Sequence, residues 1–208
     1  NERQSASGQG DGSPDVSRPC IVDTNVILVA NGQHPGVTQA CVAACQTWLT
    51  QIMAHGRIVL DDAHEILGEY GHKCDPQAGQ GVGDAFVKWA QHHLDDPNRV
   101  EWVHLERDPV WGFRAFPREG ALWLFDASDR KFVAAACSHP SRPPILQAAD
   151  SKWLDWAPTL AEHGVEVTFL CDADVHRMLQ GGQAVGGDQG GLGVAEAQLS
   201  RTTAVLGL

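Results

Sequence analysis

The chain has 208 residues, 43% of them hydrophobic and 7% aromatic, and a formal net charge of −11. This length and apolar content suit one globular domain with a sizeable core, and no apolar run approaches the roughly 18 residues that a membrane-spanning helix needs. The acidic balance argues against a protein that coats nucleic acid by bulk attraction, because phosphate binding depends on Lys and Arg. It leaves open a nuclease whose carboxylates bind metal ions.

The two ends of the chain differ in composition from its middle. Residues 1–17 are rich in Gly, Ser, Pro and Asp, and residues 180–208 begin with a Gly-rich run. Both segments are predicted to be flexible, because they have few large apolar residues to offset the loss of conformational entropy on folding. The predicted folded domain therefore spans residues 18–179.

Strand patterns and helix patterns alternate along this domain. They predict, in chain order, a buried strand at 20–28 that runs into a loop, a helix at 37–56, a strand at 57–60, helices at 61–73 and 83–96, a strand at 100–106, a helix at 125–139, a strand at 143–150, a helix at 151–164 and a strand at 165–171. Asp61 and Asp62 are candidate caps. Residues 107–120, which include Pro109, Gly112 and Pro117, are predicted to be an irregular excursion. This alternation implies a parallel sheet covered on both faces, hence an α/β fold.

Six cysteines occur without the short CxxC pairs that indicate a zinc or redox site, at positions 20, 41, 45, 74, 137 and 171. The spacing of Cys41 and Cys45 puts them on one helix face, where buried thiols behave as small hydrophobes. We therefore expect reduced core cysteines in a cytoplasmic protein, where disulfides are rare. The alternative is a metal site from scattered Cys and His residues, with His92 and His93 as the densest pair.

Acidic residues recur where a parallel sheet would gather them. Asp23 lies in the first apolar run and Asp150 follows another, and ligands of open parallel sheets bind at the carboxyl ends of the strands. Two pairs at helical spacing can join them, namely Glu65 with Glu69 and Asp126 with Asp129. Carboxylates that share a site repel one another, and a divalent metal is the simplest compensation.

Oxygen ligands of this kind select Mg²⁺ or Mn²⁺. Such ions activate water and stabilise the leaving oxygen of a phosphodiester. The acidic set therefore predicts metal-dependent phosphodiester chemistry.

The order of these motifs resembles the PIN (PilT N-terminus) domain nuclease family. The motifs VDTNV, HEILGEY, DRKFVAAA and ADSKWL are similar to the family's four acidic motifs, and the resemblance covers about residues 20–171. It implies a three-layer α/β/α fold with a central parallel sheet. In active members it also implies metal-dependent cleavage of RNA that leaves 5′-phosphate and 3′-hydroxyl ends.

The resemblance assigns metal-binding and catalytic roles by position. The four implied ligands of Mg²⁺ or Mn²⁺ are Asp23, Glu69, Asp129 and Asp150. Asn25 is implied to steady the first motif through hydrogen bonds. Asp126, Glu65 and Ser151 are accessory candidates, and Ser151 is included because Ala148 and Ala149 stand where the family often has polar residues.

Substrate contacts are expected from basic and aromatic side chains, which meet phosphate and stack on bases. The candidates are Arg130, Lys131, Lys152, Arg114 and Trp111. Each acidic residue also has a structural alternative. Asp23 and Asn25 could form an Asx-type turn, the other aspartates could cap helices, and the glutamates could face water.

The predicted function is a metal-dependent endoribonuclease that acts on single-stranded RNA, as the toxin of a toxin–antitoxin pair or as an RNA-processing or defence nuclease. Its expected partners are RNA and an antitoxin or other protein, with no membrane, and homodimers are common in the resembled family. Two alternatives stay open. One is a PIN-shaped interaction module without catalysis, and the other is a nuclease that cuts DNA.

Overall fold

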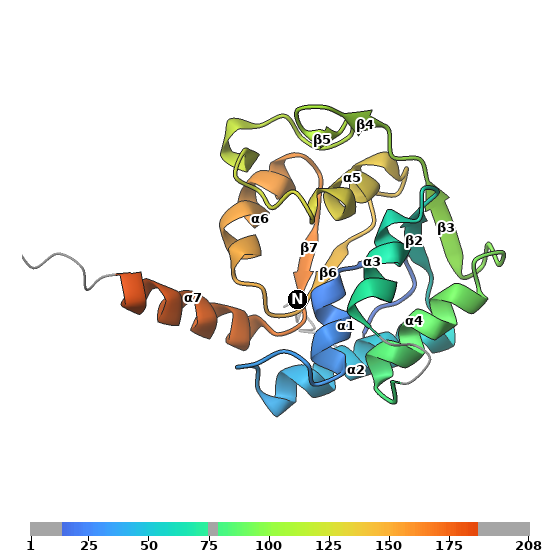
Figure 1. Ribbon diagram of the computed structural model, residues 1–208, viewed down its shortest axis with the longest axis horizontal. Coiled ribbons are helices and arrows are strands. Elements are labelled where there is room, and N and C mark those ends of the chain that lie inside the picture. The colour runs from blue at the N-terminus through green and yellow to red at the C-terminus, as the bar shows by residue number, and fades with distance from the viewer. Residues whose placement is uncertain (1–13, 75–78, 187–208) are drawn as a thin grey trace, which may run out of the picture.

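The structure, a computed structural model, describes residues 14–74 and 79–186, with residues 181–186 described by their backbone alone (Figure 1). Its strands are β1 (Ile21–Val22), β2 (Ile58–Asp61), β3 (Val100–Val103), β4 (Arg107–Asp108), β5 (Gly112–Phe113), β6 (Ile145–Gln147) and β7 (Val167–Phe169). Its helices are α1 (Thr24–Ala30), α2 (Gln39–His55), α3 (Glu65–Lys73), α4 (Val82–His92), α5 (Arg130–Ser138), α6 (Lys152–Glu162) and α7 (Asp172–Gly186), with a 3₁₀ turn η1 at Gly120–Leu122.

Five short parallel strands form the centre of the molecule. β1, β6 and β7 form one parallel sheet and β2 and β3 another. A parallel bridge between Cys20 and Ile58 joins the two sheets. The spatial order is therefore β3-β2-β1-β6-β7, and the mixed α/β class is confirmed. Because the chain moves outward from β1 in both directions, the strand order reverses between β1 and β6, where open α/β sheets place their ligands.

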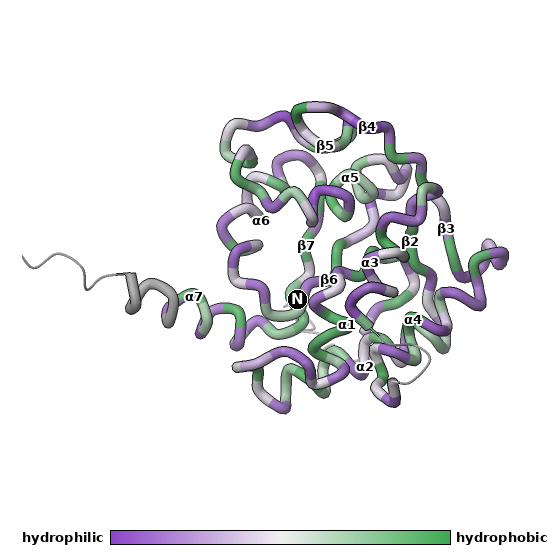
Figure 2. Tube along the Cα trace, in the orientation of Figure 1, coloured by the Kyte–Doolittle hydropathy of each residue, from purple (hydrophilic) through white to green (hydrophobic). Residues whose placement is uncertain are grey.

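The core lies along these strands and the helices beside them. Ile21, Val22 and Leu60 are fully buried, and α5 contacts β1, β2 and β6 while α1 contacts α2, α4 and β6. Apolar residues follow the same inner segments in Figure 2. Because strands buried on both faces need apolar residues at every position, their sequences read as continuous apolar runs.

The first predicted strand is shorter than expected, and the loop predicted after it is wrong. β1 ends at Val22, and Asp23 caps α1 by accepting a hydrogen bond from the Asn25 amide at 2.8 Å. The apolar residues after Asp23 continue as a buried helix. A short apolar run cannot distinguish a buried strand from a buried helix by periodicity alone.

The other predicted elements lie close to the observed ones, except that the helices expected at 61–73 and 125–139 begin at Glu65 and Arg130 and that α7 was not predicted. Asp61 caps α3 by accepting from the amides of Glu65 and Ile66, whereas Asp62 pairs with His104. The excursion at 107–120 contains the antiparallel pair β4 and β5. Helix α7 passes the expected boundary at residue 179 and reaches Gly186. The rest of the predicted tail, and residues 1–13, lie outside the described residues.

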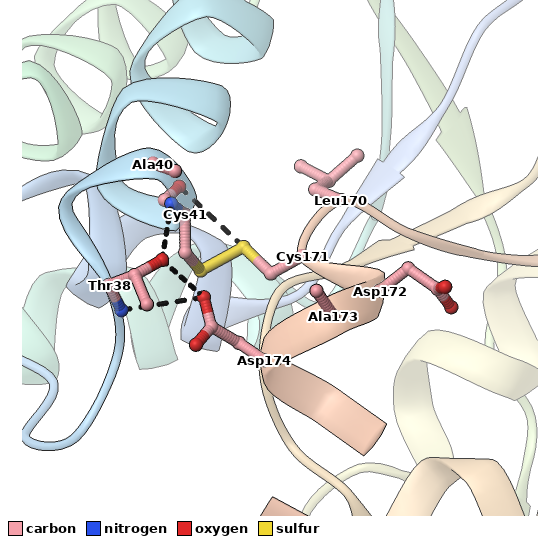
Figure 3. Close-up of a pocket in the computed structure, with 8 residues that line it drawn as sticks. All are labelled: Thr38, Ala40, Cys41, Leu170, Cys171, Asp172, Ala173 and Asp174. Atoms are coloured by element: carbon pink, nitrogen blue, oxygen red, sulfur yellow. Dashed lines mark hydrogen bonds between the residues drawn. A yellow bond between two sulfur atoms is a disulfide. The ribbon is translucent and has the colours of Figure 1, made fainter. Parts of the chain in front are cut away.

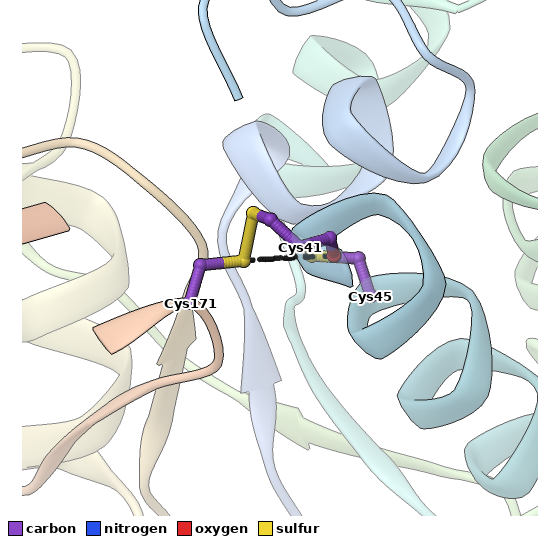
Figure 4. A group of neighbouring side chains, drawn as sticks. All are labelled: Cys41, Cys45 and Cys171. Atoms are coloured by element: carbon purple, nitrogen blue, oxygen red, sulfur yellow. Dashed lines mark hydrogen bonds between the residues drawn. A yellow bond between two sulfur atoms is a disulfide. The ribbon is translucent and has the colours of Figure 1, made fainter. Parts of the chain in front are cut away.

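A disulfide joins Cys41, in the first turn of α2, to Cys171, which directly precedes α7 (Figures 3 and 4). The expectation of reduced cysteines is therefore wrong for this pair and correct for the other four. The pairing of Cys41 with Cys171 could not be inferred from the spacing of the cysteines, because the two residues are 130 positions apart. The disulfide also removes the argument from reduced cysteines for a cytoplasmic location.

Polar contacts reinforce this attachment of α7. The Thr38 hydroxyl donates to Asp174 at 2.7 Å, and the Arg177 guanidinium donates to the Gly36 carbonyl at 2.7 Å (Figure 3 shows the first of these). The Cys45 sulfur lies 3.8 Å from that of Cys171, because Cys45 is one helical turn after Cys41 (Figure 4). Two cysteine side chains of α2 thus face Cys171.

We predict that Cys171→Ser lowers the free energy of unfolding by about 2–4 kcal/mol under oxidising conditions, because the disulfide restricts the unfolded chain. Chemical denaturation measures this change, with Cys137→Ser, a free thiol of α5, as the control. Cys171 is the better position to change, since Cys45 could replace Cys41 as its partner. If a reductant leaves the midpoint of the unaltered protein in place, the prediction fails.

Candidate functional site

Asp23 is fixed at the point where the strand order reverses. Its amide donates to the Leu146 carbonyl of β6 at 3.0 Å, and its carboxylate caps α1. Only 5% of the residue is exposed. The Asx-type interaction considered for this motif is therefore present, and it holds a carboxylate in the interior at the carboxyl end of β1.

Asn25 connects this strand end to the segment that carries Asp150. The side-chain oxygen of Asn25 accepts from the backbone amide of Ala149 at 2.9 Å, while the backbone amide of Asn25 donates to the Asp23 carboxylate. Asp150 is partly exposed and accepts from the Lys152 amide at 3.0 Å, before α6. Asn25 thus braces both acidic segments, although its side chain bonds backbone rather than a carboxylate.

Asp126 and Asp129 lie in the turn before α5. The Ser128 hydroxyl is 2.9 Å from an Asp126 oxygen and 3.2 Å from an Asp129 oxygen, within hydrogen-bonding distance of both. The Asp129 side chain makes no capping bond to α5. Helix capping therefore does not account for Asp129, whose carboxylate accepts from the Ser128 hydroxyl instead.

The pKa shifts show that the four segments bring their carboxylates into electrostatic reach of one another. Burial, and then the charge of Asp126, raise the pKa of Asp129 to about 6, with smaller contributions from Asp150 and Glu69. Burial and the charge of Asp129 raise the pKa of Asp23 well above its usual range. Like charges and lost hydration both disfavour ionisation, so this cluster is poorly compensated by protein groups.

Glu69 differs from the aspartates because side chains of the protein donate hydrogen bonds to both of its carboxylate oxygens. Its Oε1 accepts from the Thr24 hydroxyl at 2.6 Å, and its Oε2 accepts from the Lys131 ammonium. Lys131 is buried and also donates to the Ser128 carbonyl. Within residues 14–74 and 79–186, no basic side chain forms an ion pair with Asp23, Asp129 or Asp150.

Thr24 and Ser128 are the site residues that sequence reasoning missed. Both stand next to predicted ligands, in VDTN and in DASD. A hydroxyl beside a carboxylate was the available signal, but its partner could not be read from the sequence, since Thr24 bonds a residue 45 positions away.

Several accessory and substrate-contact candidates have other partners. Glu65 pairs with Arg107 at 2.6 Å. Arg130 is buried, and its guanidinium donates to the carbonyls of Trp123 and Phe125 at 2.9 and 3.3 Å. Its burial and these two hydrogen bonds within the protein argue against Arg130 as a substrate contact.

The remaining candidates vary in accessibility. Trp111 is half-buried and packs against Phe116 and Trp123, so it belongs to an aromatic cluster. Arg114 is exposed and pairs with Glu106 at 2.5 Å. Lys152 is exposed and its charge helps lower the pKa of Asp126, which places it beside the acidic cluster. Ser151 is partly exposed and its side chain makes no capping bond.

The donor set fits a hard divalent cation by its chemistry, because it offers carboxylate oxygens that lack a basic partner. The oxygens are not drawn together, however. Among the described residues, the group of potential ligands whose atoms all lie within 4.8 Å of one another is Cys41, Cys45 and Cys171. Two of these form the disulfide, and sulfur ligands do not select Mg²⁺ or Mn²⁺. The acidic cluster is thus an open arrangement.

Comparisons of the chain with protein-family models, with curated proteins and with solved structures find no match. In the described part of the chain, no helix has the length and apolar character needed to cross a membrane.

The raised pKa of Asp129 predicts a pH dependence of stability. Between about pH 4 and pH 6 the folded protein binds more protons than the unfolded chain, so this group makes the metal-free protein less stable as the pH rises through that window. Thermal unfolding should show that Asp129→Asn reduces this loss. Mn²⁺ at pH 7 should raise the melting temperature of the unaltered protein and not that of the variant.

Asp95→Asn, which changes an exposed carboxylate, is the control for this experiment and should behave like the unaltered protein. A melting temperature of Asp129→Asn that follows pH and Mn²⁺ as the unaltered protein does would contradict the prediction.

Proposed function

We propose that the chain is a PIN-like endoribonuclease that depends on Mg²⁺ or Mn²⁺, with Asp23, Asp129 and Asp150 as its main ligands and Glu69 as the fourth acidic group. One observation carries the proposal. Asp23 is buried and Asp129 is half-buried, both have raised pKa values, and neither forms an ion pair with a basic side chain among the described residues. A bound divalent cation is the natural compensation for such a pair.

The fold supports the same proposal. Strand order reverses between β1 and β6, and Asp23 and Asp150 follow the carboxyl ends of these two strands. Helices α1, α2 and α4 contact one another, and α5 contacts β1, β2 and β6. This distribution is consistent with helices on two faces of a parallel sheet, which is the proposed three-layer arrangement.

The residues of the chain have separate tasks in this proposal. A bound Mg²⁺ or Mn²⁺ would lower the pKa of an attacking water and neutralise charge on the scissile phosphate. Asn25 fixes Asp23 relative to the Asp150 segment, and Ser128 orients Asp126 and Asp129. Lys131 neutralises Glu69, so that the total charge met by a phosphodiester is less negative.

A cleavage assay on single-stranded RNA with added Mg²⁺ or Mn²⁺ tests the proposal. Asp23→Asn and Asp129→Asn should each reduce the rate by more than about 100-fold, because each removes a ligand. Asp95→Asn should leave the rate unchanged, and single-stranded DNA in parallel reactions tests the DNA alternative. Metal-dependent cleavage that survives both site substitutions would reject the assignment.

The ion pair between Lys131 and Glu69 favours a second candidate, an interaction module of PIN-like shape without catalysis. The Lys131 ammonium donates to the Glu69 carboxylate, which the resemblance assigns as a metal ligand. Calorimetry distinguishes the two proposals. If Mn²⁺ binding is absent, or does not depend on Asp23 and Asp129, the module is the better account.

A further inference from the structure

A hollow of about 570 Å³ lies along the exposed face of α3, beside the acidic cluster. We call it the α3 groove, and its main lining residues are His64, Gly68, Glu69, His72, Lys73 and Ser128. Its volume is in the range of small-ligand sites, about 300–1,000 Å³. Glu69 and Ser128 belong to both the groove and the acidic cluster, so a ligand in the groove would border the proposed metal ligands.

The helix sequence leaves the groove open at its middle. Gly68 is exposed, and a Cβ added there would meet nothing within 4 Å. Gly68 and His72 are one helical turn apart and share one face of α3, and His64 directly precedes the helix. Both imidazoles line the groove together with the bare backbone of Gly68.

The chemistry of the groove suits a nucleotide. Imidazole rings stack on unpaired bases, and an exposed ammonium meets phosphate. Lys73 provides that ammonium at the end of α3. The ring of His64 packs edge-on to Trp102, with centroids 5.1 Å apart, and Trp102 itself is 38% exposed. An aromatic wall therefore continues beyond the groove.

The negative charges in the groove are already compensated. Glu65, which also lines it, pairs with Arg107, and Glu69 pairs with Lys131. A phosphodiester lying there would not face uncompensated carboxylates, unlike one placed directly on Asp23 and Asp129. The groove and the acidic cluster are thus electrostatically distinct neighbours.

We propose that the α3 groove binds the nucleotide adjacent to the scissile phosphate of single-stranded RNA, with its base over Gly68 between His64 and His72 and its phosphate at Lys73. This proposal rests on the proposed endoribonuclease function. It assigns the positioning of the strand to α3, so that recognition of the nucleotide is separate from the acidic groups that act on the phosphate.

The test compares Gly68→Leu with Gly71→Leu. Both glycines are exposed, lie in α3 and leave open space for an added Cβ, but Gly71 does not line the groove. Both substitutions favour the helix. In an Asp129→Asn background, which prevents cleavage, Gly68→Leu should weaken binding of a fluorescent single-stranded RNA about tenfold or more, measured by anisotropy. Gly71→Leu should leave it unchanged.

A second variant keeps the test decisive if Gly68→Leu does not fold. His72→Ala should weaken RNA binding severalfold, whereas His55→Ala, at the exposed end of α2, should not. Equal RNA binding by Gly68→Leu and Gly71→Leu, or by His72→Ala and His55→Ala, would overturn the proposal that the α3 groove binds RNA.

Hydrolysis of methyl p-nitrophenyl phosphate separates this failure from failure of the proposed function. The small diester does not fill the groove, so its hydrolysis by the unaltered chain and by the control Gly71→Leu depends on the acidic cluster alone. If the unaltered chain hydrolyses neither substrate, the nuclease proposal fails, and the binding comparison still decides whether the groove holds RNA.

Discussion

The burial of Asp23 at the end of the central strand is the constraint on which the candidate site depends. Asp23 directly follows β1, and its carboxylate caps α1 and lies near other acidic groups. Its removal from water and the neighbouring negative charges therefore both disfavour its ionisation. The protein compensates part of this cluster itself, with Lys131 at Glu69 and Ser128 at Asp126 and Asp129. A bound divalent cation would compensate the negative charge that remains.

Much of the fold followed from local patterns. The helix at 37–56 could be predicted because its apolar spacing and the terminal Gly56 act within one segment, and α2 ends as expected. The run at 20–28 was assigned wrongly after Val22, since a fully buried segment carries no polar alternation to mark its period. The disulfide between Cys41 and Cys171 depends on tertiary proximity alone.

The candidate site, like the fold, could be predicted only where the signal is local in the sequence or follows from sheet topology. That acidic residues following β1 and β6 would lie within electrostatic reach of each other could be predicted from the rule that parallel strands end at one edge. The partner of each side chain could not. Lys131 was expected to face substrate and instead bonds Glu69, 62 residues earlier, and Arg130 turns into the aromatic cluster. A helix begins after Asp129, so neighbours in sequence point to different surroundings.

The central claim is that Asp23, Asp129 and Asp150 form a divalent cation site. The most direct measurement is the anomalous scattering of crystals soaked in Mn²⁺. The account predicts an anomalous peak among these three carboxylates, with oxygen ligands at about 2.2 Å, and its loss in Asp23→Asn crystals. A map without a peak at this position, or a peak there that persists in Asp23→Asn, would contradict the account.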